Sequence, residues 1–370
     1  MSRVLAVELR LVHLELVRPF TTSFGTETMK EAILVKVETD VGEGWGESVT
    51  GADPAFSEEF NDDVWVVTRE FLAPTLFESG DVVPEGVAAA LGGYRGHRMA
   101  KSALEMAILD AQLRTEGRSM ASAFGGERDR VPVGVSVGIT PTVEEMVEQV
   151  AGYLAEGYQR IKLKIKPGFD LEPVGAVRAA FPDIMLSVDA NAAYDRDDLE
   201  IFRSLDAFGL LMIEQPFHHE DLVDHAWLQE RIETSLCLDE SIRSESDARA
   251  ALELGSCRIV NIKPGRVGGY LEAKRIHDLC LDADVPVWCG GMLETGLGRA
   301  GNLALASLPG FTLPGDISAS RRYFHEDLTE PFEVEADGTM AVPQGPGLGV
   351  YPDEGRLEAR TSRVERIEPG

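Results

Sequence analysis

Five short runs of the chain are rich in apolar residues and carry a charged residue at or near their end, and in three of them, 160–166, 185–191 and 258–263, apolar and polar positions alternate with a period of two. The runs span residues 160–166, 185–191, 210–214, 235–239 and 258–263. Segments with the apolar spacing of amphipathic helices lie between them. The charged ends, Lys164, Asp189, Glu214, Asp239 and Lys263, follow one another at intervals of 24 or 25 residues. Strands that alternate with helices predict a parallel sheet, and this repeat length is typical of a TIM-type barrel.

The same alternation predicts where the charged side chains point. In the first run Ile161 and Leu163 share one face, whereas Lys162 and Lys164 share the other. The apolar face suits the outer helices of a barrel, so we expect the polar face to look inward. Buried charges are costly unless they are paired or bind a metal, and barrel active sites lie at the carboxyl ends of the strands. Three acids with a lysine on either side therefore predict a site for metal-assisted proton abstraction.

The remaining patterns predict a second domain before the barrel. Strand patterns cover residues 2–18, 32–39 and 44–48, and helical patterns cover 56–77, 83–94 and 98–115. Strands followed by helices indicate an α+β domain over residues 1–130. Barrel strands begin at 133–139, the seventh and eighth strands are expected at 286–292 and 311–318, and the barrel is assigned to 131–324. No strong helix is expected after the eighth strand, and residues 325–370 are expected to pack back on the first domain.

Composition and charge limit the classes of partner. The chain of 370 residues has a net charge of −28, which argues against nucleic acid or an anionic membrane as a partner. No apolar run reaches the roughly 18 residues of a membrane span, and no signal-peptide pattern precedes the first strand, so a cytoplasmic location is expected. The four cysteines show no metal-type spacing and are expected to be reduced core residues.

Three acids on successive strands suit a divalent cation. One acid at a strand end is more often an ordinary ion-pair partner, but Asp189, Glu214 and Asp239 together offer the oxygen ligands that Mg²⁺ or Mn²⁺ prefers. Asn191, Gln215 and Glu240, which lie next to the three acids, are expected to orient these ligands. The histidines at positions 97, 218 and 219 have no partner at metal spacing and are interpreted as structural or surface residues.

The two flanking lysines have three interpretations. A lysine inside a barrel can be an ion-pair partner, a Schiff-base nucleophile or a general base. Lys164 and Lys263, on strands at opposite sides of the acids, suit a proton taken from one face of a carbon and returned to the other. Lys162 lies deeper and suits electrostatic support, whereas Lys166 belongs to a loop. The paired glycines at 290 and 291 indicate either a tight turn or a close approach of the backbone to a substrate.

Six motifs together resemble the enolase superfamily, in its muconate-lactonising-enzyme subgroup. They are Lys162-Leu-Lys164, Val188-Asp-Ala-Asn191, Ile213-Glu-Gln-Pro216, Leu238-Asp-Glu-Ser241, Asn261-Ile-Lys-Pro-Gly-Arg266 and Gly290-Gly-Met-Leu-Glu-Thr-Gly296. The resemblance extends over nearly the whole chain and is strongest to the branch of o-succinylbenzoate synthases and N-succinylamino acid racemases. It implies an α+β capping domain over a (β/α)₇β barrel, with a homo-oligomeric assembly.

The resemblance also implies a reaction. Mg²⁺, held by Asp189, Glu214 and Asp239, would bind the carboxylate of a small substrate, and the proton α to it would be removed to give an enediolate. Lys164 and Lys263 would be the catalytic pair in a racemase, whereas Lys164 alone would be base and then acid in the synthase. Binding or supporting roles fall to Lys162, Asn191, Phe20, Ser136, Gly291 and Met292. The loop around Phe20 and the loop after Gly51 would close over the substrate.

One departure from the subgroup bears on the substrate. Dipeptide epimerases carry Asp-x-Asp at the end of the eighth strand, and this chain has Asp316-Ile-Ser318 there. A free amino group is therefore not obviously provided for, which favours an N-acylated or amine-free substrate. Muconate-type cycloisomerisation and dipeptide epimerisation stay open as alternatives. A Schiff-base aldolase and a non-catalytic binding protein are the alternatives from other classes.

Overall fold

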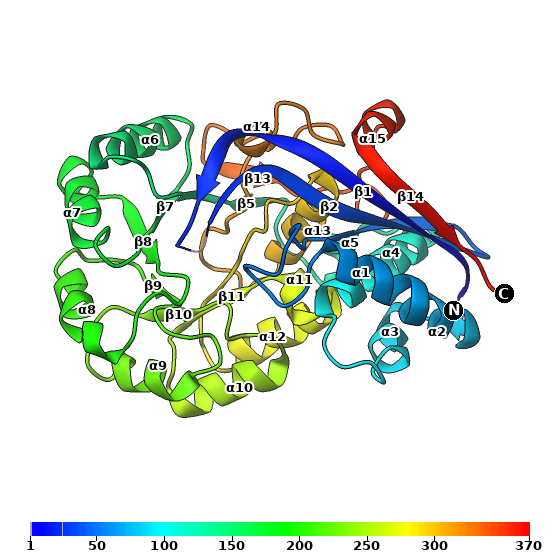
Figure 1. Ribbon diagram of the computed structural model, residues 1–370, viewed down its shortest axis with the longest axis horizontal. Coiled ribbons are helices and arrows are strands. Elements are labelled where there is room, and N and C mark those ends of the chain that lie inside the picture. Colours follow the sequence, from blue (N-terminus) through cyan, green and yellow to red (C-terminus); the bar gives the residue numbers. More distant parts are fainter. Residues whose placement is uncertain (1, 24) are drawn as a thin grey trace.

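A seven-stranded parallel sheet lies at the centre of the larger half of the molecule, inside a ring of helices (Figure 1). The computed structural model describes residues 2–23 and 25–370. The strand order is β12-β11-β10-β9-β8-β7-β6, so each strand lies beside its neighbour in the chain. The strands are β6 (Gly134–Val137), β7 (Arg160–Lys164), β8 (Met185–Asp189), β9 (Ile213–Glu214), β10 (Leu236–Leu238), β11 (Ile259–Ile262) and β12 (Val287–Cys289). Each coincides with a predicted barrel strand and is shorter than its pattern.

The eighth position of the barrel is an irregular segment rather than a regular strand. Phe311 forms a parallel bridge to Val287 of β12 and Gly315 forms one to Val133, directly before β6, so residues 311–316 connect the two edges of the sheet. The Gly134 N–H donates to the Gly315 carbonyl and the Asp316 N–H donates to that of Cys289. The predicted strand at 311–318 is therefore wrong as a regular element. A proline at position 314 has no N–H to donate to a ladder, which accounts for the irregularity.

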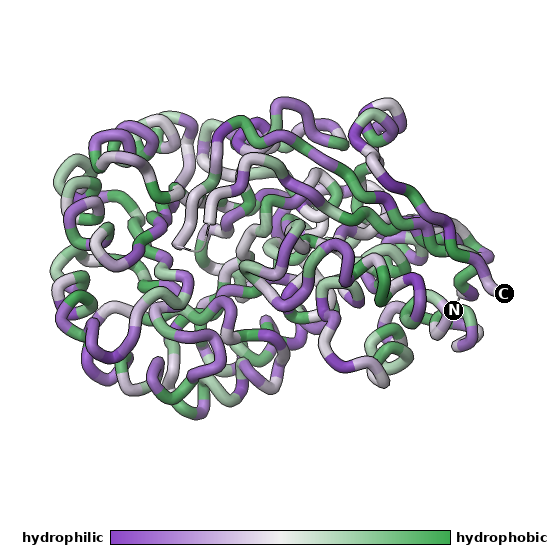
Figure 2. The backbone as a smooth tube through the Cα atoms, in the orientation of Figure 1, coloured by the Kyte–Doolittle hydropathy of each residue, from purple (hydrophilic) through white to green (hydrophobic). Residues whose placement is uncertain are grey.

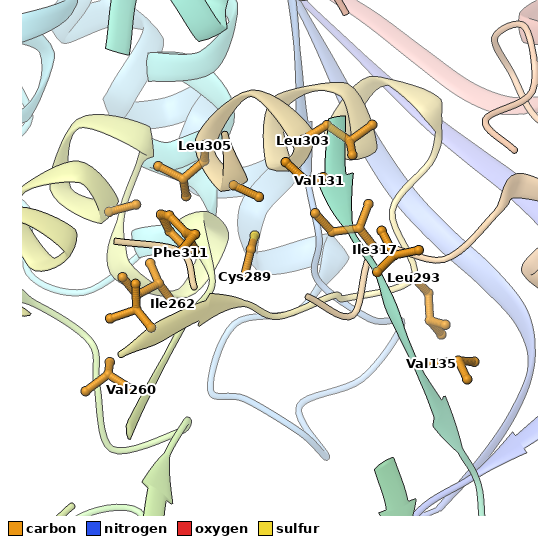
Figure 3. Packing of buried hydrophobic residues seen from close by; sticks show 14 of the residues in the cluster. Val131, Val135, Val260, Ile262, Cys289, Leu293, Leu303, Leu305, Phe311 and Ile317 are labelled. Atoms are coloured by element: carbon orange, nitrogen blue, oxygen red, sulfur yellow. The ribbon is translucent and has the colours of Figure 1, made fainter. Parts of the chain in front are cut away.

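Helices follow the strands and cover the outside of the sheet (Figure 1). They are α6 (Val143–Ala155), α7 (Leu171–Ala180), α8 (Leu199–Asp206), α9 (Leu222–Gln229), α10 (Glu245–Leu254), α11 (Pro264–Val267), α12 (Tyr270–Asp282) and α13 (Gly296–Ala306). Hydrophobic and hydrophilic residues alternate along the backbone of these helices (Figure 2). Figure 3 shows part of the resulting core, where Val260 and Ile262 of β11 and Cys289 of β12 lie near Phe311 and Leu305.

The N-terminal part of the chain forms an antiparallel sheet with helices packed on it, and a strand from the C-terminal segment joins this sheet. The sheet order is β14-β1-β2-β3, with β4 also paired to β1. Its strands are β1 (Ser2–Thr21), β2 (Thr26–Thr39), β3 (Glu43–Ser48), β4 (Asp81–Val82) and β14 (Thr361–Ile367). Its helices are α1 (Asn61–Val67), the π-helix η1 (Thr68–Leu72), α2 (Ala73–Glu78), α3 (Pro84–Ala90), α4 (Arg98–Glu116) and α5 (Met120–Phe124). The C-terminal segment thus supplies an edge strand to the N-terminal sheet, and the domain boundaries given above stay a prediction.

Three local predictions differ from the structure. The predicted loop over 19–25 is shorter, because β1 continues to Thr21 and β2 already begins at Thr26; residue 24 of that loop lies outside the described residues. The first helix begins at Asn61 instead of residue 56. The tail contains helices α14 (Ser320–Tyr323) and α15 (Glu354–Arg360), which the polar pattern after the barrel did not indicate. Asp353 caps α15, because its carboxylate accepts the Arg356 N–H in the first turn of the helix.

Close backbone packing joins the antiparallel sheet to α4. A Cβ atom at Gly44 would lie 2.2 Å from the Ala107 carbonyl oxygen, and one at Gly46 would lie 2.0 Å from that of Ala103. Only glycine permits this approach of β3 to the helix. A short sheet of β5 (Arg130–Pro132) and β13 (Thr339–Ala341) lies where the barrel begins.

Two further findings concern the whole described chain. All four cysteines are free and buried, as expected for reduced core residues. Within residues 2–23 and 25–370, no helix is both long and apolar enough to cross a membrane.

Candidate active site

A cavity of about 260 Å³ lies between the carboxyl ends of the barrel strands and two segments of the N-terminal domain. The tip of the β1–β2 hairpin reaches over the barrel, where the Ile139 N–H donates to the Thr21 carbonyl (Figure 1). The second segment is the loop 49–57 after β3. Six of the predicted site residues line the cavity, namely Phe20, Lys164, Asn191, Lys263, Gly291 and Met292. The structure therefore brings the two lysines and both predicted loops to one space.

The strand register places the predicted acids and lysines on the inner side of the sheet. Asp189 lies opposite both Lys164 and Glu214. Glu214 pairs with residue 237, so Asp239, the residue directly after β10, lies two positions further along the chain with the same orientation. Lys263 is displaced from Asp239 in the same way on the next strand. A two-residue stagger of this kind accompanies the strand tilt of a barrel and keeps inward side chains near one level.

The deepest part of the site is an ion network around Lys162. Its Nζ donates to Glu214 Oε2 at 2.7 Å, and lies 2.7 Å from Asp316 Oδ2 and 3.1 Å from Asp189 Oδ2. Arg160 Nη2 donates to the other oxygen of Asp316 at 2.5 Å. Burial opposes the charge of Lys162, but the three carboxylates outweigh it and raise the pKa of its ammonium well above the ordinary value. Lys162 is therefore a fixed positive charge beneath the cavity, and its role as electrostatic support stays a prediction.

Each cavity lysine is held by its own carboxylate. Lys164 Nζ donates to Asp189 Oδ2 and to Asn191 Oδ1, at 2.7 Å in both cases. Lys263 Nζ donates to Asp239 Oδ2 at 2.8 Å, and Arg266 donates to the second oxygen of Asp239. The two ammonium groups thus approach the cavity from β7 and from the end of β11, with the three acidic strands between them.

The three central carboxylates differ in their protonation because of their neighbours. Burial alone would raise the pKa of Asp189, but Lys164 and Lys162 lower it far below the ordinary value. The pKa of Glu214 is raised to about 8 by burial and by the charge of Asp189. Burial likewise opposes ionisation of Asp239, but Arg266 and Lys263 lower its pKa. The middle carboxylate therefore experiences repulsion that a cation among the three would relieve.

The donor set fits a hard divalent cation. Asp189, Glu214 and Asp239 are at most 1% exposed, they come from three adjacent strands, and they offer only oxygen atoms. Their oxygens do not form one of the groups within residues 2–23 and 25–370 whose ligand atoms all lie within 4.8 Å of one another. In the structure the three are turned instead toward lysine and arginine side chains.

Strained backbone at the strand ends orients these acids. Asn191 has φ of 43° and Gln215 has φ of 39°, in the left-handed region that non-glycine residues rarely adopt. The backbone N–H of Asn191 donates a hydrogen bond to Asp189 Oδ1, and its side-chain amide donates one to Glu240 Oε1 at 2.9 Å. Gln215 Oε1 accepts the Asp239 N–H at 3.0 Å. The orienting roles of Asn191 and Gln215 stay a prediction, for which these contacts supply the means.

Close packing at the end of β12 requires glycine at positions 290 and 291. If Gly290 were replaced by a residue with a side chain, its Cβ atom would lie 2.3 Å from Asn261 Oδ1 and 2.6 Å from Lys263 Cε. A Cβ at Gly291 would lie 2.4 Å from the Asp316 carbonyl oxygen. Gly290 therefore leaves room for the side chains of Lys263 and Asn261. This role differs from both sequence interpretations of the glycine pair, a tight turn and close approach of the backbone to a substrate.

Several other residues differ from their interpretation. Ser136 is buried on β6 outside the cavity lining, and its hydroxyl has no hydrogen-bond partner among the described residues. The histidines do have partners at metal distance: His218 and His219 with Glu220, and His97 with two acids of the N-terminal domain, at positions 59 and 63. The first group is a run of consecutive residues, whereas the second joins His97 to acids far from it in the chain. Sequence spacing therefore did not reveal the group around His97.

Sequence reasoning also missed three charged residues of the site. Arg266 was quoted only as the end of a motif, yet it binds Asp239. Asp316 was considered only as a possible ammonium ligand, yet Arg160 and Lys162 bind it. Lys30 of β2 lines the cavity and was not considered. For Lys30 the one available signal was the scarcity of lysine in a chain that otherwise uses arginine for positive charge.

Comparison with known families decides where the chain belongs. Residues 6–125 match the family model of the mandelate racemase / muconate lactonizing enzyme N-terminal domain, and residues 145–356 match that of the enolase C-terminal domain-like family. The chain belongs to the enolase superfamily. The resemblance inferred from the six motifs is confirmed, as is the prediction of a barrel with an N-terminal capping domain.

Relatives within the superfamily cover nearly the full chain. An N-succinylamino acid racemase of Amycolatopsis sp. is 56% identical over 97% of this chain and 98% of its own length. An o-succinylbenzoate synthase of Geobacillus kaustophilus is 50% identical over 96% of this chain and 95% of its own length. A solved structure of an enolase superfamily member from Listeria innocua is 40% identical, covers both chains completely and has a TM-score of 0.95.

Proposed function

We propose that the chain is a Mg²⁺-dependent enolase-superfamily enzyme that abstracts the proton α to a carboxylate, as an N-succinylamino acid racemase, an o-succinylbenzoate synthase, or both. The observation that carries this proposal is the pair of cavity lysines, Lys164 and Lys263, on opposite sides of three strands that each end in a buried acid. Relatives at 45–56% identity carry both names, which supports either reaction at one site.

The proposed ligands of Mg²⁺ are Asp189, Glu214 and Asp239. When bound, the metal would neutralise the substrate carboxylate and the negative charge that develops there as the proton leaves. Lys162 and Arg266 would hold positive charge beside these acids and fix their orientation. Mn²⁺ is the expected substitute because it accepts the same oxygen ligands.

The lysines would move the proton. In racemisation Lys164 and Lys263 would act on opposite faces of the α-carbon, one removing the proton and the other returning one. In the synthase reaction Lys164 would first take the α-proton and then protonate the leaving hydroxyl, while Lys263 would supply positive charge. Phe20 and the loop 49–57 would exclude water above the reacting carbon. A homo-oligomer is proposed from the superfamily alone.

The contacts of Asp316 disfavour dipeptide epimerisation. Both of its carboxylate oxygens are engaged by the side chains of Arg160 and Lys162, so it offers no free charge to a substrate ammonium. The position two residues later is a serine. An N-acylated substrate, which has no ammonium group, agrees with this arrangement.

Proton NMR in D₂O, with Mg²⁺ and N-succinyl-L-phenylalanine, tests the proposal. We expect the α-proton signal to disappear together with optical rotation, and chelator to stop both. Exchange without loss of rotation would indicate one working face and favour the synthase. If no α-proton exchanges, the next assay is formation of o-succinylbenzoate. Failure of both assays would refute the proposal. Lys166→Ala is the matched control, because Lys166 is exposed and lies two residues beyond Lys164.

A borohydride experiment separates the Schiff-base alternative. Trapping a covalent substrate adduct on Lys164 would support an aldolase-type barrel and contradict the proposed mechanism. We expect no adduct, because the lysine is proposed to exchange protons without forming a bond to carbon.

A further inference from the structure

A buried lysine of the N-terminal domain forms part of the cavity wall. Lys30 is 4% exposed although the four residues before it on β2 are exposed. Alternation along the strand places it on the same face as Ala32 and Leu34, which pack in the cluster shared with the barrel. Its Nζ donates to the carbonyls of Val49 and Thr50, at 3.2 and 3.3 Å. The ammonium is thus held at the loop that closes the cavity.

Lys30 differs from the other cations of the cavity in lacking an acidic partner. Three lysines line the space, and Lys164 and Lys263 each donate to a carboxylate. Among the described residues no carboxylate oxygen lies within 4.0 Å of Lys30 Nζ, which hydrogen-bonds to the two carbonyl groups. A buried ammonium without a counter-charge is costly, so its position next to a ligand cavity indicates an anionic ligand group.

Acidic residues also border the cavity, but they lie at its exposed rim or have other partners. Glu27 and Asp53 are exposed, and Asp53 accepts the Ala55 N–H. Glu31 is 3.3 Å from a ring nitrogen of His13. These charges face water, where they are screened, whereas Lys30 acts in the low-dielectric interior.

We propose that Lys30 Nζ binds the second carboxylate of a dicarboxylic substrate, and so determines the acyl specificity of the enzyme. This inference rests on the proposed function and adds a specificity-determining residue to it. The first carboxylate, next to the reacting carbon, belongs at the barrel floor with the acids and the cavity lysines. The second reaches the capping side through its acyl arm. A succinyl group carries such a terminal carboxylate, and it is common to both proposed reactions.

The test compares two substrates on matched variants. N-Succinyl-L-phenylalanine carries the second carboxylate, and N-butanoyl-L-phenylalanine has an acyl chain of the same carbon number without it. Lys30→Met removes the charge at similar length, Lys30→Arg keeps it, and Lys36→Met is the control. Lys36 lies on the same face of β2 outside the cavity lining, where it pairs with Glu43 at 2.7 Å.

The substitution should separate the two substrates. A charge-assisted hydrogen bond is worth about 10- to 100-fold in affinity, so Lys30→Met should lower kcat/KM for the succinyl substrate by about that factor, mainly through KM. The butanoyl substrate should change by less than about twofold. Lys30→Arg should recover part of the loss, and Lys36→Met should change neither substrate. Equal losses with both substrates would mean that Lys30 only holds the loop 49–50, which overturns the proposal.

A binding measurement keeps this result distinct from a failure of the proposed function. Isothermal titration of both compounds into Mg²⁺-loaded wild type and Lys30→Met measures how much the second carboxylate adds to affinity, whether or not the enzyme converts the compound. If wild type catalyses no reaction but prefers the succinyl compound, and Lys30→Met loses this preference, the reaction is wrong and the carboxylate site stands. If wild type binds both compounds equally, the carboxylate site is wrong even where turnover occurs.

Discussion

Glu47 offers a quantitative test of how the capping domain is joined to the barrel. It lies on β3, is 3% exposed, and faces the start of α13. One carboxylate oxygen accepts the Thr295 N–H at 2.9 Å, and the other accepts the Thr295 hydroxyl at 2.7 Å and the Gly298 N–H at 2.9 Å. Burial raises the pKa of Glu47 to about 7 in spite of these donors.

The raised pKa determines the sign of a stability effect. In the unfolded chain the carboxyl loses its proton near its ordinary pKa of 4.5, whereas in the folded protein it keeps the proton up to about pH 7. The folded state therefore binds more protons in this window, and stability falls as pH rises from 4.5 to 7. At about 1.4 kcal/mol per pH unit, the full effect of Glu47 is roughly 3 kcal/mol.

Glu47→Gln should remove this dependence. The amide resembles the protonated carboxyl and stays neutral at every pH, so the variant should gain stability relative to wild type as pH rises. We expect the difference in unfolding free energy to grow by roughly 3 kcal/mol between pH 4.5 and 8. Urea unfolding followed by tryptophan fluorescence measures it, with chelator present so that metal binding does not contribute. Glu43→Gln, at the exposed start of the same strand, is the control and should show no such growth.

The opposite slope would refute the reasoning. The N–H groups at the start of a helix can stabilise an ionised carboxylate. If that effect exceeded the cost of burial at α13, Glu47 would be charged in the folded protein at pH 6. Glu47→Gln would then lose stability relative to wild type as pH rises toward 4.5, and the difference would stay constant above that pH. A difference that is independent of pH would equally contradict a raised pKa.

Three further predictions concern the site and the glycines. Lys164→Ala and Lys263→Ala should each lower racemisation by about 10²- to 10⁴-fold, while NMR should show residual α-proton exchange of only one enantiomer, a different one for each variant. Gly46→Ala should destabilise the protein by about 1–3 kcal/mol in urea unfolding, because the new methyl group would lie 2.0 Å from a backbone oxygen of α4. Gly93→Ala, with no neighbour within 4 Å, should not. Gly290→Ala should lower kcat more than it lowers the melting temperature, because it displaces Lys263; unchanged kcat would contradict that role.

The barrel part of the site was predictable because its information is local. A strand of period two fixes which side chains share a face, and a regular repeat fixes which strands are neighbours. These two facts bring Lys164, Asp189 and Glu214 together without any knowledge of the loops. The eighth position was missed because its backbone bridges both edges without a regular ladder, and its apolar residues resemble a strand in sequence.

The contacts between the domains were not predictable in the same way. Lys30 lies more than 100 residues before the barrel lysines, and only the packing of β2 over the barrel places it at the cavity. Glu47 bonds to a helix about 250 residues later, and nothing in its own strand pattern marks it as buried. Such residues can be found in sequence only as polar positions in otherwise apolar surroundings, a signal that many surface residues share.

This division has a consequence for the chemistry. The groups proposed to bind metal and move protons all come from the barrel, where adjacent strand ends hold them by short ion pairs. The groups above the reacting carbon, including Phe20 and Lys30, come from the capping domain. Substitutions on the capping side should therefore change which acyl group is accepted while leaving proton abstraction intact. A site built in this way can serve two reactions of substrates that share a succinyl arm, because the arm and the reacting carbon are recognised by different domains.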